Sequence, residues 1–354
     1  MSHEWHMVCE LCSCRVPSLF GDKQRGKTAI SCGNLAYVWK MEVLNIMSDT
    51  LPARGLTADL FDPVATMMDK FWAGGMPLMA DRPFPEGGLV HHYTTVEAAI
   101  SIIEKQRFWS TNIAFLNDFN ERVCALNVLT NIIEAPDTGV FKDEGAKELA
   151  RQLVSTIKDQ YVHATFVTSF CDSGDMLGQW RGYGGGVSIA FDAEELDAAF
   201  DEQTSLVRVL YRPAEQSEIF DRMIVTASSW LADKKDDDDF ENIKWEGLSR
   251  LRVYFENISA KMKNMSFYDE REWRLLTKRD ISPLTDRPEV HFRARGKAIS
   301  PYIELDPNNG KLPIRGITLS PNSHSSAGSS FQAILHKYGY EDVLVNNSTI
   351  PYRD

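Results

Sequence analysis

The sequence predicts an α+β protein with mixed, largely antiparallel sheets, surrounding helices and a helical insertion. Strand-like and helix-like segments follow one another without the regular alternation of a doubly wound sheet. The strand segments are short, rich in β-branched and aromatic residues, and bounded by turn residues. No G-x-G-x-x-G follows a first strand and no G-x-x-x-x-G-K-[ST] occurs, so the Rossmann and P-loop folds lose support.

The elements expected in the first half follow from periodicity and capping signals. A strand at 89–95 runs into a helix at 96–106, and Thr94 and Glu97 have capping-box spacing before it. A short strand within 107–118 ends at Asp118, which with Glu121 fits the cap of the next helix. The remaining elements expected before residue 187 are helices at 119–133 and 143–160 and a strand at 163–171.

The second half is expected to supply most of the strands. Residues 213–262 have a helical pattern that the acidic run KKDDDDFEN interrupts, and this run is expected to be a solvated loop or helix end. The strands expected here are 187–192, 205–211, 270–277, 289–294, 301–305 and 314–320, followed by a helix at 325–339 and a final strand and tail from 342.

Composition shifts divide the chain into three parts. Residues 1–46 have little periodicity, so we expect a disordered tail or an over-extended start. Residues 47–88 predict a leading helix and a Pro- and Gly-rich linker. Residues 89–354 predict a single α+β domain, with the helical insertion at about 213–262. A C-x-x-C-x-C motif begins at Cys9, but no second ligand pair follows at a zinc-finger spacing, so no metal site is predicted.

The charge balance restricts the partners. The 354 residues include 38 Lys and Arg against 50 Asp and Glu, a net charge of −12. Non-specific nucleic-acid binding needs a basic surface, so it is not expected. No apolar run is long enough to span a bilayer, so no membrane segment is expected. The first residues do not resemble a secretory signal, and with the scattered cysteines this predicts a cytoplasmic protein.

The first candidate cluster is His92-Tyr93-Thr94, at a strand end that leads into a helix. Such a helix N-terminus can present polar groups to an anionic ligand. His92 could then hydrogen-bond a ribose hydroxyl, and Tyr93 could stack on a ring. The alternative is that one of His91 and His92 faces solvent while Tyr93 packs in the core.

The second cluster is GQWRGYGGG, residues 178–186. Trp180 and Tyr183 offer flat faces for stacking, and Gln179 and Arg181 offer hydrogen-bond donors. The glycines would allow close approach of the backbone to a ligand. A glycine-rich turn between two strands, with the aromatic rings buried beneath it, explains the same residues equally well.

The third cluster is the charged run DEREWR, residues 269–274. Alternate residues of a strand share one face, so Glu270 and Glu272 would aim two carboxylates at one place and Trp273 would enter the core. Two such carboxylates could form an acid–base or electrostatic pair. The alternative is an edge strand with exposed glutamates paired to Arg271 and Arg274.

Taken in order, these segments resemble the bacterial domain-of-unknown-function family 2971. The resemblance rests on "HYTTVEAAISIIEKQRFWSTNIAFLND", "TSF", "LGQWRGYGGGVSIAFD", "EREWRL", "PYIEL" and "IPYR", which run from about Leu89 to Arg353. Members of the family are similar to proteins suspected of roles in bacterial defence and toxin systems. The resemblance therefore implies a bacterial protein with a role of that kind.

The order of the clusters is also similar to that of the ADP-ribosyltransferase superfamily. Those enzymes place a His or Arg on a first core strand, a Ser-containing strand next, and an E-x-E or lone Glu on a later strand. The matching positions here are His92, Ser169, and Glu270 with Glu272, although "TSF" stands where the superfamily has "STS". The resemblance implies a split β core with NAD as substrate in a cleft between two small antiparallel sheets, and no metal.

The same resemblance implies roles for the candidate residues. Glu272 would hydrogen-bond the nicotinamide ribose and stabilise the oxocarbenium-like transition state, and Glu270 would orient or deprotonate the acceptor. The ligand-binding residues would be His92, Tyr93, Thr94, Ser169, Gln179, Trp180, Arg181 and Tyr183. Three hypotheses stay open. They are an ADP-ribosyltransferase-like enzyme with an unidentified macromolecular acceptor, a non-catalytic nucleotide- or partner-binding module, and a metal-dependent nucleotide or nucleic-acid processing enzyme that uses Asp118 with the two glutamates.

Overall fold

The computed structural model divides into two compact units, Met1–Phe61 and Asp62–Asp354. The residues that the structure describes all lie in the second unit: 84–116, 120–134, 141, 143–159, 165–183, 186–279, 287–295 and 298–351. The predictions for the tail 1–46, for most of the segment 47–88 and for Asp118 therefore lie outside the described residues.

Within these residues the strands form one sheet, which is antiparallel except for a parallel pair at one edge. The strands are β1 (Leu89–Thr94), β2 (Phe108–Asn112), β3 (Thr165–Cys171), β4 (Val187–Asp192), β5 (Thr204–Arg208), β6 (Glu272–Lys278), β7 (Val290–Arg295), β8 (Ala298–Leu305), β9 (Ile314–Leu319) and β10 (Leu344–Asn347). Their order is β10-β9-β4-β1-β3-β2-β8-β7, and β6 pairs with both β3 and β5. The predicted α+β class and the largely antiparallel pairing are confirmed. The two small sheets of a split β core, which the sequence resemblance implied, are not found: the described strands form one branched sheet.

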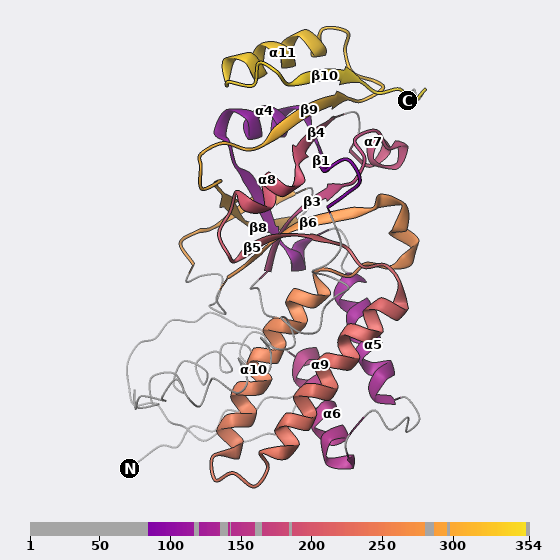
Figure 1. Cartoon of the computed structure of the whole chain (residues 1–354), viewed down its shortest axis with the longest axis vertical. Helices are drawn as coiled ribbons and strands as arrows, with labels where there is room; N and C mark the ends of the chain where they lie inside the picture. The colour runs from indigo at the N-terminus through magenta and orange to yellow at the C-terminus, as the bar shows by residue number, and fades with distance from the viewer. Residues whose placement is uncertain are drawn as a thin grey trace, which may run out of the picture. The chain divides into compact units, whose positions relative to one another are not determined.

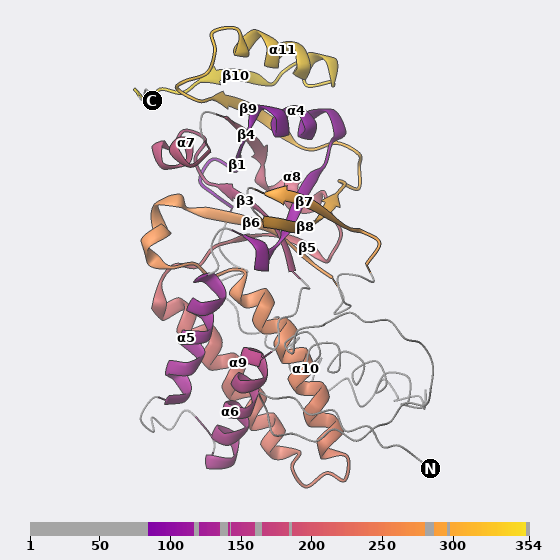
Figure 2. The same ribbon diagram turned by 180° about the vertical axis from the view of Figure 1, so that it is seen from behind.

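The helices fall into two groups (Figure 1). The helices α4 (Val96–Lys105), α8 (Ala193–Ala198) and α11 (Ala327–Lys337) pack on the sheet. The helices α5 (Asn120–Glu134), α6 (Glu144–Asp159), α9 (Pro213–Asp233) and α10 (Phe240–Ser259) run side by side in both views (Figures 1 and 2). Two of them, α9 and α10, occupy the stretch where a helical insertion was expected. Three short helices complete the described elements: η1 (Ile113–Phe115), α7 (Leu177–Tyr183) and η2 (Met265–Glu270).

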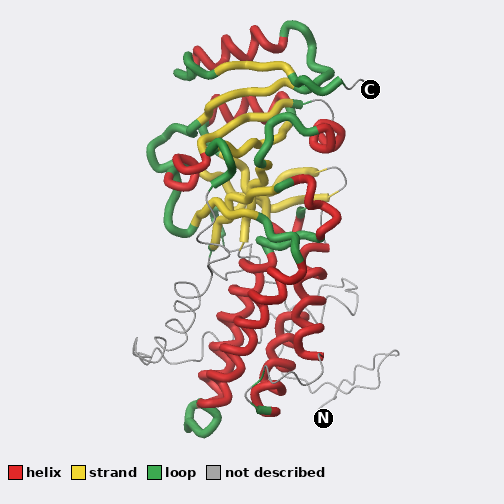
Figure 3. The backbone as a smooth tube through the Cα atoms, turned by 45° about the vertical axis from the view of Figure 1, so that its right-hand side comes forward, coloured by secondary structure: helices red, strands yellow, loops and turns green. Residues whose placement is uncertain are grey.

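Each group has its own apolar core, and Figure 3 shows the strands and the long helices as separate layers. The sheet core includes Phe108, Phe170, Phe191 and Trp273, so the prediction that Trp273 is buried is confirmed. The bundle core includes Phe220 and Phe255, whose rings stack 5.5 Å apart. No described helix is long and apolar enough to cross a membrane.

The sheet branches at β3, and this branch creates the space for a site. One edge of β3 pairs with β6 over seven residues. The other edge is shared: β1 pairs at Cys171, and β2 pairs at Phe166 and Val167. Ser169 lies between these two contacts, and the ring of His92 contacts its carbonyl with an Nδ1–O distance of 2.8 Å.

Two local predictions are wrong in detail. Thr95, not Thr94, caps α4, because its hydroxyl accepts from the Ala98 amide at 3.2 Å. Thr94 is the last residue of β1 and is buried. The glycine-rich stretch was expected to be an irregular loop or turn, but its first half is helix α7.

Candidate functional site

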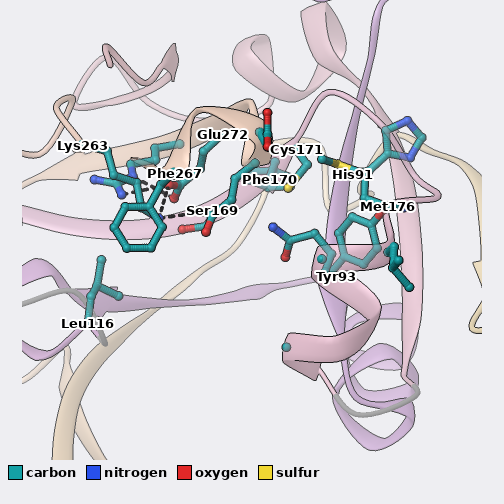
Figure 4. Close-up of a pocket in the computed structure, with 17 residues that line it drawn as sticks. His91, Tyr93, Leu116, Ser169, Phe170, Cys171, Met176, Lys263, Phe267 and Glu272 are labelled. Carbon is teal, nitrogen blue, oxygen red and sulfur yellow. Dashed lines mark hydrogen bonds and ion pairs between the residues drawn. The ribbon is translucent and has the colours of Figure 1, made fainter. Parts of the chain in front are cut away.

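A cavity of about 870 Å³, here called the cleft, lies where β1, β3 and β6 adjoin, with residues of α7 and η2 in its walls. Its volume is in the range of about 300–1,000 Å³ that is typical of small-molecule sites. Figure 4 shows His91 and Phe267 at opposite ends of the view, with Tyr93, Cys171 and Ser169 between them. The cleft is therefore elongated.

Strand register determines the floor of the cleft. His91 on β1 lies opposite Cys171 on β3, which lies opposite Glu272 on β6. Two residues along, Ser169 lies opposite Arg274. Alternate strand residues share a face, so both rows point to the same side of the sheet. All five side chains line the cleft.

A buried ion cluster occupies one end of the floor. Arg274 binds Glu272 at two points, Nε–Oε1 at 2.9 Å and Nη2–Oε2 at 3.0 Å. Lys263 bridges the two glutamates, at 3.1 Å from Glu272 and 2.7 Å from Glu270. The Glu272 amide also donates to the Tyr211 hydroxyl at 2.9 Å. The cluster ties the start of β6 to β3, η2 and the end of the bundle.

The electrostatics of the cluster keep Glu272 ionised. Burial opposes ionisation, but the charges of Arg274 and Lys263 and a hydrogen bond from Ser169 outweigh it and lower the Glu272 pKa to about 2. Burial likewise disfavours the Lys263 ammonium, but Glu272 and Glu270 raise the Lys263 pKa above its usual range. Glu272 therefore carries its negative charge at neutral pH.

Glu270 does not share a strand face with Glu272, and that part of the prediction is wrong. Glu270 ends the short helix η2, and Arg271 between the two glutamates has a positive φ of 44°. The two carboxylates nevertheless converge on Lys263. Glu270 is the more accessible one, with 33% of its side chain exposed against 5% for Glu272.

Helix α7 supplies one wall. Gln179 lines the cleft, and its side-chain amide makes no hydrogen bond to the described residues. Trp180 does not line the cleft: it is 2% exposed and packs edge-on against Tyr93 at 4.8 Å. Its Nε1 donates to Asp175 at 2.7 Å. The alternative of an aromatic ring buried beneath the segment therefore holds for Trp180.

The two adjacent histidines have opposite surroundings. His92 was predicted to bind the ligand, but its ring packs against Phe108 and Phe170 on the core side of β1, away from the cleft. Burial lowers its pKa, while the bond to the Ser169 carbonyl opposes that shift. His91 lines the cleft instead; its buried Nδ1 has no hydrogen-bond partner, and burial lowers its pKa to about 4.

The other predicted residues divide in the same way. Tyr93, Ser169, Gln179, Glu270 and Glu272 meet in the cleft. Thr94 and Arg181 do not line it. Tyr183 ends α7, and its side chain lies outside what the structure describes. His92, Trp180 and Glu272 were expected to converge on one cleft, and Glu272 alone of the three reaches it.

Sequence reasoning missed Lys263, Phe267 and His91 as cleft residues. A buried carboxylate such as that of Glu272 needs a nearby cation. Arg274, two positions from Glu272 on the same strand face, could be predicted as that cation by the i, i+2 rule. Lys263 could not, because it follows a long helix and reaches β6 through the tertiary fold. Its ammonium also lies 4.8 Å from the Phe267 ring, a cation–π distance.

The cluster also bears on metal binding. Within the described ranges no three His, Cys, Asp or Glu side chains are grouped as metal ligands. The Lys263 ammonium stands between Glu270 and Glu272, at the place where a cation bridging these two carboxylates would bind. Asp118, the third expected ligand, lies outside the described residues.

Comparison with known proteins gives one match. Residues 179–275 match the model of a family described as "Protein of unknown function (DUF2971)". This stretch begins in α7, passes through α9, α10 and η2, and ends in β6. No curated protein and no solved structure matches the chain. From Gln179 to Leu275, which includes one wall and the ion cluster of the cleft, the chain is therefore similar to a family of unknown function.

Proposed function

We propose that the cleft binds NAD by its nicotinamide–ribose end and that the protein is an ADP-ribosyltransferase-like enzyme. The observation that carries the proposal is the convergence of five separately predicted residues, Tyr93, Ser169, Gln179, Glu270 and Glu272, on one cleft of suitable size. These residues come from five elements, β1, β3, α7, η2 and β6, which are far apart in the sequence. The ADP-ribosyltransferase part rests on the sequence resemblance.

The charge of the cleft supports a cationic ligand group. Its lining contains three carboxylates, those of Asp269, Glu270 and Glu272, and two cations, Lys263 and Arg274. The excess of one negative charge favours the nicotinamide cation over a free phosphate. Phe267 offers an aromatic face beside this cluster, and Gln179 offers an amide that can pair with a carboxamide.

The accessible hydrogen-bonding groups suggest how the roles are divided. Glu272 is held by Arg274 and Lys263, so it fixes the charge and geometry of the cluster. Glu270 is more exposed and is better placed to accept from a ribose hydroxyl or an acceptor group. In the proposed reaction the bond from ribose C1′ to nicotinamide breaks, nicotinamide leaves, and the acceptor bonds to C1′ as it loses a proton. Glu270 would take that proton.

A non-catalytic nucleotide-binding module is the second candidate. One observation favours it: both Glu272 oxygens already accept hydrogen bonds from buried cations. A carboxylate neutralised in this way stabilises a developing positive charge less than a free one does. Such a module would bind the ligand through Gln179 and His91 and would not turn it over.

Calorimetric titration with NAD, together with an assay of nicotinamide release, tests the proposal. We expect binding and slow release for the native chain, loss of release in Glu270→Gln, and weakened binding in Gln179→Leu. Glu202→Gln, an exposed change outside the cleft, is the matched control. Binding without release would favour the module. Absence of NAD binding would reject both the enzyme and an NAD-binding module.

A role as toxin or defence effector follows from the family resemblance alone. If the enzyme proposal holds, expression in a bacterial host should slow growth, and Glu270→Gln should relieve the effect. Equal growth with both chains would argue against that role while leaving the NAD measurement to decide the chemistry.

A further inference from the structure

The carboxylate of Asp175 joins two distant parts of the chain. It accepts from Trp180 Nε1 at 2.7 Å, on the α7 side. It also accepts from the Ser348 hydroxyl at 2.6 Å, and from the Thr349 amide and hydroxyl at 2.8 and 3.0 Å. A carboxylate can accept about four hydrogen bonds, so this one is fully used.

Residues 348–350 form a strap that follows the edge strand β10. The Ser348 amide donates to the Leu319 carbonyl at 2.9 Å, which continues the β9–β10 pairing by one residue. Ile350 then packs against the small cluster of Tyr93, Cys171 and Trp180. In Figures 1 and 2 the chain beyond β10 runs on the side of the sheet where α7 lies.

The strap contacts the same residues that set the wall of the cleft. Asp175 lies two positions before α7, whose second turn includes Trp180. The Tyr93 hydroxyl donates to the Ser173 carbonyl at 3.0 Å and accepts from the Met176 amide at 2.9 Å, so it fixes the loop on either side of Asp175. Gln179, whose side-chain amide makes no hydrogen bond to the described residues, is adjacent to Trp180 in α7, so a shift of Trp180 would displace it.

We propose that Asp175 is a positioning residue that couples the C-terminal strap to helix α7 and so sets where Gln179 stands over the cleft. The proposal rests on the cleft being the ligand site of the proposed function. Burial opposes the charge on Asp175, but the hydrogen bonds from Ser348, Trp180 and Thr349 lower its pKa, so it remains an acceptor at neutral pH. By linkage, a ligand that binds Gln179 stabilises the contact between the strap and Asp175. Loss of that contact in turn weakens binding of the ligand.

The coupling can be measured without any ligand, because Cys171 lies in the floor behind α7. Its thiol is buried in the same apolar cluster as Trp180, so alkylation by N-ethylmaleimide reports opening of the wall. Cys124, on α5 in the helical bundle, is an internal control in the same molecule. Peptide mass mapping follows both rates.

Two variants break the contact from opposite sides. Asp175→Asn changes the acceptor, and Ser348→Ala with Thr349→Val removes two of the three donors on the strap. We expect each to speed alkylation of Cys171 by roughly tenfold, with Cys124 unchanged. The variant that combines all three changes should be no faster than Asp175→Asn, because both sides act through one contact.

Three results would overturn the proposal. Acceleration in Asp175→Asn but not in the strap variant would mean that Asp175 supports Trp180 alone. Equal acceleration at Cys171 and Cys124 would mean global unfolding, and no acceleration would mean that the wall does not depend on the contact.

NAD serves as the second probe, and we expect about tenfold weaker binding of NAD in both variants. Failure of the native chain to bind NAD would reject the proposed function, and the alkylation rates would still decide the coupling.

Discussion

Arg274 and Glu272, two residues apart on β6, form a two-point ion pair whose side chains are 1% and 5% exposed. Buried pairs of this kind add little net stability compared with apolar residues, but removing one partner leaves an uncompensated charge. A change at either residue should therefore destabilise the start of β6. Lys263 links this pair to η2, because its ammonium also binds the Glu270 carboxylate.

Glu272→Gln should lower the free energy of unfolding by about 3 kcal/mol, because Lys263 and Arg274 would remain buried with one carboxylate fewer. Urea unfolding followed by circular dichroism measures it. Glu270→Gln is the control: its carboxylate is a third exposed, so the loss should be at most about 1 kcal/mol. Equal losses in the two variants would contradict the difference in burial.

Acid should remove the contribution of Glu272 to the free energy of unfolding. Its pKa falls from the ordinary value of 4.5 to about 2 on folding, so the folded state binds fewer protons than the unfolded state. The contribution is complete above about pH 4.5 and is lost as the pH falls toward 2. Unfolding free energies measured across this window should fall less steeply for Glu272→Gln than for the native chain. Parallel curves would mean that another group controls the acid response.

Substitution of the two adjacent histidines should affect different properties: the free energy of unfolding for His92 and ligand binding for His91. His92→Leu leaves the Ser169 carbonyl without its 2.8 Å partner, which should cost about 1–3 kcal/mol of unfolding free energy. His91→Leu removes no hydrogen bond made within the described residues and should leave that free energy within about 0.5 kcal/mol.

Ligand binding should show the reverse order. His91 lines the cleft as a neutral ring, so His91→Leu should weaken the binding of NAD. His92→Leu should leave the affinity of the folded protein for NAD unchanged. Calorimetry at a temperature where both variants are folded checks this. Weaker binding in His92→Leu alone would restore the ligand role first predicted for that residue.

Two glycines of the same motif should respond oppositely to alanine. A methyl group at Gly186 would collide with the backbone carbonyl of Thr94, so Gly186→Ala should destabilise by about 1–3 kcal/mol. A methyl at Gly182, inside α7, meets nothing within 4 Å, and Gly182→Ala should be neutral or gain up to about 1 kcal/mol of helix propensity. Thermal unfolding of the two variants distinguishes them.

Local pattern predicted most of the elements, because their hydrophobic periods and caps lie within one segment. The helix expected at 96–106 is α4 (Val96–Lys105), and the strand expected at 187–192 is β4. Helix α7 was missed because the five glycines of residues 178–186 indicate a turn, whereas the burial of Trp180 against Tyr93 holds the segment in a helix. Tertiary packing of one aromatic ring outweighed local propensity.

Residue types and their spacing in the sequence were sufficient to predict the α+β class, most of the elements, and Glu270 and Glu272 as candidate residues. The tertiary structure alone decided which groups meet. It placed His91 rather than His92 in the cleft, because the ring of His92 contacts the Ser169 carbonyl on the core side of β1. It also brought Lys263 and the strap at Ser348 and Thr349 to the site, through contacts between segments that no local pattern links.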